Sequence, residues 1–149
     1  MSSDPRFSCN FLDFKTERNP KPGMYEEYFL NYDTSKWKAG SGGGAFKFFD
    51  GKGMEYSLTI SEDSRYGIML AYEKWDDQNN KSIGSWYSVG NESELAQMFE
   101  NEDELLTPIG AYMNPEDAWL VVKNFLSDPT EISQKVKWID AEDIPWPEE

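Results

Sequence analysis

The run Met54-Glu55-Tyr56-Ser57-Leu58-Thr59-Ile60 decides the fold, together with the run Tyr66–Trp75 that follows it. Apolar and polar side chains alternate in the first run, and the second run continues this alternation. A period of two residues is typical of an antiparallel strand with one buried face. The polar residues Asp76–Asn80 then supply a turn, and a third alternating run covers Ile83–Val89. The sequence therefore predicts consecutive antiparallel strands joined by tight turns.

Two more strands are predicted before these runs. Ala45–Phe49 is followed by the turn residues Asp50–Gly53, which lead the chain back into the first alternating run. Glu27–Tyr32 has the composition of a strand as well. The glycine-rich stretch Gly40–Gly44 lacks the Lys-Ser/Thr ending and the following helix of a phosphate-binding loop, so we interpret it as a strand connection.

One long helix is predicted near the C-terminus, over about residues 115–127. Asn114 is a favourable N-cap, and Pro115 suits the first helical position. Apolar residues recur at spacings of three and four between Ala118 and Leu126, as on the buried side of a helix. Asp128-Pro129 ends the pattern.

These elements predict an α+β fold. The strands come mostly first and the long helix late, which favours a mainly antiparallel sheet with that helix packed on one face. A short closing strand is expected over Val136–Trp138, and a weaker helix over Glu92–Phe99. We predict a single domain over residues 1–149, with a flexible N-terminus (1–23) and an acidic tail (140–149).

The composition argues for a folded binding protein. The chain has 149 residues, with 28 Asp and Glu against 14 Lys and Arg, for a net charge of −14. Aromatic residues make up 15%, whereas disordered acidic chains are poor in them. Histidine is absent and Cys9 is the one cysteine, which excludes histidine-based triads and the usual zinc sites. We therefore expect no enzyme activity, no metal and no cofactor.

The sequence also suggests a compartment. The stretch Met1–Arg6 has neither a basic start nor an apolar run, and no stretch approaches the roughly 20 apolar residues of a membrane helix. A single thiol without a disulfide framework suits a reducing compartment, so we expect a cytoplasmic protein with no membrane partner. The net charge argues against a nucleic-acid partner, because it repels phosphate.

Acidic residues are concentrated in the second part of the chain. Residues 1–53 hold 8 Lys and Arg and 7 Asp and Glu, whereas residues 54–149 hold 6 and 21. Asn91–Leu105 contains six acids and no base, which is compatible with a solubilising loop or with a docking face for a basic protein. On such a face carboxylates imitate the phosphates that the partner binds, and their field speeds association. The candidate steering residues are Glu100, Glu102, Asp103 and Glu104.

Aromatic side chains are candidate anchors for such a partner. Trp75, Trp86 and Tyr87 are the residues we select, because the alternation puts both tryptophans on a sheet face with small or polar neighbours. We assign Trp119 and Trp138 to the core instead. An alternative function is a small β-rich module that binds a sugar or another neutral ligand through exposed aromatics. A carboxylate-based hydrolase is a third hypothesis, but with 28 acids neighbouring carboxylates arise by chance.

The C-terminal half resembles a known family over about residues 65–139. The segments that carry the resemblance are Arg65–Tyr72, Gly84–Gly90, Leu106-Thr107-Pro108, Asn124-Phe125-Leu126 in the capped helix, and Val136-Lys137-Trp138. In this order they resemble the Imm-one family of bacterial immunity proteins, which protect a cell from a cognate secreted toxin. The resemblance implies a protein that occludes the active site of a toxin such as a nuclease or a nucleic-acid deaminase. A toxin with a basic substrate groove would suit an acidic partner.

Overall fold

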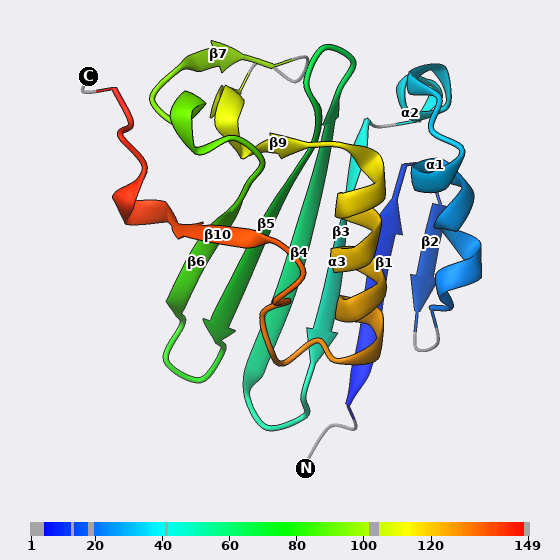
Figure 1. Ribbon diagram of the computed structural model, residues 1–149. Helices are drawn as coiled ribbons and strands as arrows, with labels where there is room; N and C mark the ends of the chain where they lie inside the picture. Colours follow the sequence, from blue (N-terminus) through cyan, green and yellow to red (C-terminus); the bar gives the residue numbers. More distant parts are fainter. Residues whose placement is uncertain (1–4, 13, 18–19, 41, 102–104, 148–149) are drawn as a thin grey trace.

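The main sheet has eight antiparallel strands in the described part of the chain, in the order β10-β6-β5-β4-β3-β1-β2, with β9 paired to β5 (Figure 1). The computed structural model describes residues 5–12, 14–17, 20–40, 42–101 and 105–147. The strands are β1 (Arg6–Phe11), β2 (Phe14–Glu17), β3 (Gly43–Phe49), β4 (Met54–Asp63), β5 (Gly67–Asp76), β6 (Lys81–Val89), β9 (Tyr112–Met113) and β10 (Lys137–Asp140).

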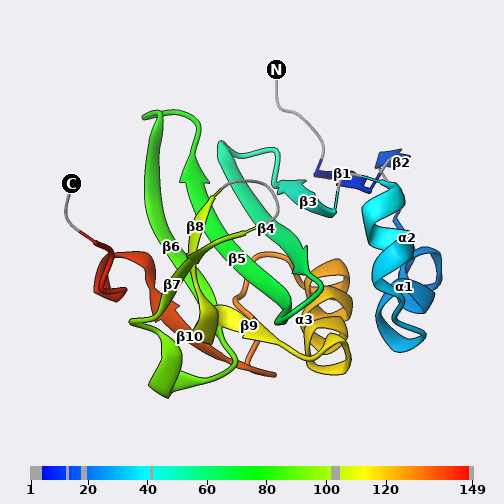
Figure 2. The ribbon, with the colours of Figure 1, turned by 90° about the horizontal axis from the view of Figure 1, so that it is seen from above.

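The helices lie on one side of this sheet, as the view from above shows (Figure 2). They are α1 (Glu26–Leu30), α2 (Thr34–Ala39) and α3 (Pro115–Ser127). The predicted long helix is confirmed, and the side chain of Asn114 caps it by accepting the backbone N–H of Asp117 at 2.8 Å. The α+β fold with a mainly antiparallel sheet is therefore confirmed.

The core lies between the helices and the face of the sheet that the alternation marked as apolar. Leu58 pairs with Tyr72 across β4 and β5, Ile60 pairs with Leu70, and all four side chains are buried. From the other layer, α3 contributes its buried residues Ala118, Trp119, Val121, Val122 and Phe125. The apolar residues that alternate along the strands thus pack against the apolar residues that recur every three or four positions along α3.

The N-terminal quarter differs from the prediction. A flexible segment over residues 1–23 was expected, yet β1 is an inner strand of the sheet between β2 and β3, and its Cys9 and Phe11 are buried. The predicted strand Glu27–Tyr32 is wrong as well, because Glu26–Leu30 forms α1. Because this segment is helical, the ring of Phe29 packs against the rings of Phe11 and Trp37, and all three side chains are completely buried.

The weaker helix predicted over Glu92–Phe99 is also wrong. The segment contains one 3₁₀ turn, η2 (Glu92–Glu94), and then the short strand β7 (Met98–Glu100). β7 pairs with β8 (Leu106–Pro108) in a separate two-stranded sheet, and η3 (Ile109–Ala111) follows. The other 3₁₀ turns are η1 (Pro22–Met24) and η4 (Ala141–Asp143). None of the described helices is both long and apolar enough to span a membrane.

Candidate functional site

The described acids of the predicted segment lie in η2, which contains Glu92 and Glu94, and in the β7–β8 hairpin, where Glu100 ends β7. Glu100 pairs with Leu106, and one step beyond, the backbone N–H of Asn101 donates to the carbonyl oxygen of Leu105 at 2.8 Å. The backbone N–H of Leu105 in turn donates to Oδ1 of Asn101 at 3.0 Å. Of the predicted steering residues, Glu100 is exposed at the end of β7, whereas Glu102, Asp103 and Glu104 lie outside the described residues.

Apolar side chains are exposed on the same hairpin. Leu105 is 59% exposed and Leu106 is 47% exposed, beside the exposed carboxylate of Glu100. A contiguous exposed apolar patch is a feature of surfaces that another protein covers. We missed this pair in the sequence, although Leu105-Leu106 directly follows the acids and has no periodic pattern that would place it in the core.

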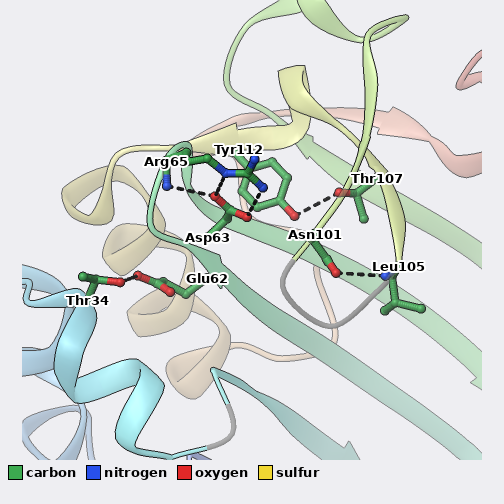
Figure 3. Close-up of polar contacts among 8 residues, drawn as sticks. All are labelled: Thr34, Glu62, Asp63, Arg65, Asn101, Leu105, Thr107 and Tyr112. Atoms are coloured by element: carbon green, nitrogen blue, oxygen red, sulfur yellow. Dashed lines mark hydrogen bonds and ion pairs between the residues drawn. The ribbon is translucent and has the colours of Figure 1, made fainter.

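An aromatic cluster fixes the base of the hairpin to the main sheet. The ring of Phe99 lies 4.7 Å from that of Tyr66 and 5.5 Å from that of Tyr112, measured between centroids. The hydroxyl groups of Thr107 and Tyr112 form a hydrogen bond of 3.0 Å (Figure 3). Both strands of the hairpin therefore contact β9 or the turn that precedes β5.

An ion pair between buried Asp63 and partly exposed Arg65 supports the same contact. Asp63, at the end of β4, is 0% exposed. Its carboxylate accepts hydrogen bonds from Nε and Nη2 of Arg65, at 3.2 and 3.1 Å (Figure 3). The guanidinium group of Arg65 also lies 5.0 Å from the ring centroid of Phe99. Burial alone would raise the pKa of Asp63, but the hydrogen bonds and charge of Arg65 outweigh it and hold that pKa below its usual value.

The preceding residue, Glu62, is buried on different partners. It accepts hydrogen bonds from the hydroxyl groups of Tyr32 and of Thr34, the latter at 2.5 Å. Burial, and then the hydrogen bond to Glu62, raise the pKa of Tyr32 above its usual range. The two adjacent carboxylates thus hold separate segments, the α1–α2 connection and the β4–β5 turn, and these contacts account for their burial in structural terms.

Substituting Asp63 by Asn should lower the free energy of unfolding by about 1–3 kcal/mol at neutral pH, because a buried carboxylate loses its charge-assisted bonds to Arg65. Since the folded-state pKa is lowered, the carboxylate stabilises the fold above its unfolded pKa of about 3.9, and the contribution is lost as pH falls through the folded-state pKa. Urea unfolding of both proteins at several pH values measures this difference, which should shrink in acid.

The matched control is Asp77→Asn in the exposed β5–β6 turn, which should change stability by no more than about 0.5 kcal/mol. A difference between Asp63→Asn and the wild type that stays constant from neutral pH to acid would contradict the role of this ion pair.

The predicted aromatic anchors are divided between two faces of the sheet. Trp86 pairs with Tyr72 on the helix side, where its half-buried ring packs 6.1 Å from that of Tyr72 against the core. Trp75 lies on the opposite face, since it pairs with Glu55 and Ser82. The expectation that Trp75 and Trp86 share a face is therefore wrong. The cause is the register between β5 and β6. Because Trp86 lies opposite Tyr72, it shares the helix side of the sheet with Tyr72, and the alternation within each strand does not reveal this register.

Tyr87 is the anchor that the structure brings towards the hairpin. It packs with Phe99 against the small buried cluster of Met69, Ala111 and Tyr112. Its ring also lies 5.7 Å from that of Trp146, which is 36% exposed. Trp75, by contrast, lies at the end of β5 that leads away from the β4–β5 turn and the hairpin (Figure 1).

Another surface feature is a shallow cavity of about 340 Å³ beside α1 and α2. The tryptophans of the alternative ligand-binding hypothesis do not line it; its walls are Leu12, Glu27, Tyr28, Lys36, Ala39 and Gly40. Among the described residues, no group of three or more Cys, Asp and Glu side chains could hold a metal ion.

Comparison of the chain with family models, curated proteins and solved structures finds no match.

Proposed function

We propose that this chain is an immunity-type protein that binds and neutralises a cognate bacterial toxin, without catalysing a reaction of its own. The observation that carries the proposal is the β7–β8 hairpin, where exposed Glu100 pairs with Leu106 across the two strands and both Leu105 and Leu106 are exposed. An exposed apolar patch with a polar rim is typical of a protein-binding surface. The resemblance to the Imm-one family supports the same role, and a cytoplasmic location would suit it.

The charge of the chain favours a basic partner. With a net charge of −14, the protein attracts a cationic surface such as the substrate groove of a nuclease or nucleic-acid deaminase. Carboxylates at the hairpin would occupy positions that phosphates take in the toxin's own complex. The two leucines would then slow dissociation, because they leave water only when the complex forms.

The test is to express the chain together with the protein encoded immediately upstream of its gene. The expected results are restored growth of a host that this protein otherwise poisons, and a complex that co-elutes from a size-exclusion column. Failure of both with a toxic upstream protein would refute the proposal, and so would turnover of a metabolite by the purified chain alone.

The substitution Glu100→Lys should slow association with that toxin about two- to fivefold at low ionic strength, with little change once salt screens the charges. Stopped-flow association rates at several salt concentrations measure the effect. The matched control is Glu131→Lys, which changes the net charge equally at an exposed position after α3. Equal slowing by both substitutions would remove the hairpin from the encounter surface.

A further inference from the structure

The face of the sheet opposite the helices is open over its centre. No described helix covers it, and all of its central side chains remain partly or fully exposed. Two rows of cross-strand partners cross β3, β4 and β5 there, formed by Ala45, Thr59 and Ala71 and by Lys47, Ser57 and Glu73. These side chains are short, except for one charge at each end of the second row. Such a surface is flat, and ordering its alanine, serine and threonine side chains on binding costs little entropy.

The charges on this face are balanced and divided. Arg6 on β1 and Lys47 on β3 lie on one half, and Glu55 on β4 and Glu73 on β5 lie on the other. Nζ of Lys47 lies 3.4 Å from Oε1 of Glu55, where the two halves meet. In a chain with twice as many acids as bases, the described side chains of β1, β3, β4 and β5 on this face have no excess of either sign. These side chains therefore add no net repulsion between two copies of the chain.

We propose that a second copy of this chain packs on the open face and forms a two-fold symmetric dimer. The two-fold axis of this dimer lies between the two packed sheets, parallel to the strands and midway between β3 and β4. The division of charge on the face is self-complementary about this axis. Such an axis sets β3 of each copy over β4 of the other, and β1 over β5, so that the basic half of each face meets the acidic half of its partner. Arg6 then faces Trp75, which offers its guanidinium group a second ring besides Phe49, 4.3 Å away in the same copy.

The size of the face is sufficient for a weak dimer. Four strands, β1-β3 and β4-β5, lie symmetrically on the two sides of this axis. β2 and β6 form the margins, and Phe99 and Trp146 pack on Tyr87 of β6 there. With a strand spacing of about 4.8 Å and rows about 20 Å long, two copies would bury roughly 1,000 Å² in total, near the lower limit of specific interfaces. Aligned packing of two twisted sheets keeps the strand directions of both copies within about 30°. The β7–β8 hairpin borders this face, because its Phe99 packs with Tyr87 at the β6 margin.

Analytical ultracentrifugation of the full chain tests the proposal. The wild type should sediment as a dimer at about 100 µM, for a dissociation constant of about 10 µM. Thr59→Arg adds a long cation beside the axis and should weaken the dimer at least tenfold. Leu120→Arg, an equal change on the exposed side of α3, should leave it intact.

Glu73→Lys is a second variant, which should also weaken the dimer because it reverses one of the two charges of the acidic half and sets a cation near Lys47 of the other copy. Circular dichroism melting shows that each variant is folded. A wild type that stays monomeric at about 100 µM overturns the proposal and leaves the face to a different occupant. Equal dissociation by Thr59→Arg and Leu120→Arg would overturn it as well, because the dimer would then use another surface.

Discussion

Replacing Leu105 and Leu106 together by serine should weaken the complex with the toxin about 100-fold, with most of the effect in the dissociation rate. Both side chains are largely exposed on the free hairpin, and a partner that covers them would bury apolar area that serine does not provide. Isothermal titration calorimetry gives the affinity, and surface plasmon resonance gives the two rates. The melting temperature should stay near that of the wild type, because neither leucine contributes to the core.

The matched control replaces Leu30 and Leu120 by serine, since these leucines are 49% and 37% exposed on the helix layer. This control should bind the toxin like the wild type. If both double variants bind with unchanged affinity while the wild type still forms the complex, the toxin uses a surface other than the hairpin.

Substituting Trp37 by alanine should lower the free energy of unfolding by about 3–5 kcal/mol. The indole is 0% exposed, its ring lies 5.0 Å from Phe11 and 5.3 Å from Phe29, and its N–H donates to the carbonyl oxygen of Tyr28 at 3.1 Å. Alanine would leave a cavity between α2 and β1 that these large rings cannot fill. Urea denaturation followed by circular dichroism measures the loss.

The control is Trp146→Ala, which removes an equally large side chain that is 36% exposed and should cost no more than about 1 kcal/mol. If Trp37→Ala unfolds only α1 and α2 and leaves the rest at wild-type stability, the N-terminal layer is a separate unit rather than part of one cooperative core.

The central strands and the long helix could be predicted because local sequence decides them. The alternation from Met54 to Ile60 commits one face to the core whatever covers it, and Asn114 with Pro115 specifies where α3 begins. The segment Glu27–Tyr32 carries no such signal. Its short run of mixed aromatic and acidic residues is compatible with a strand or with a helix. In the structure it is a helix, in which Phe29 packs on Trp37.

The candidate site was predictable only in its charge. The acidic segment that includes Glu100 can be identified from the sequence, because the number of charged residues does not depend on the fold. Asp63 and Arg65 gave a weaker signal, an acid and a base two residues apart, and nothing in the sequence showed that this pair supports Phe99 from a different hairpin.

By itself, the sequence determined the net charge of −14, the alternating strands, the capped helix and the absence of histidine. The tertiary structure alone decided which surfaces remain open: the hairpin with Leu105 and Leu106, and the sheet face around Thr59. The physical reason is that periodicity reveals which side of an element is apolar, whereas exposure depends on what packs there from distant parts of the chain.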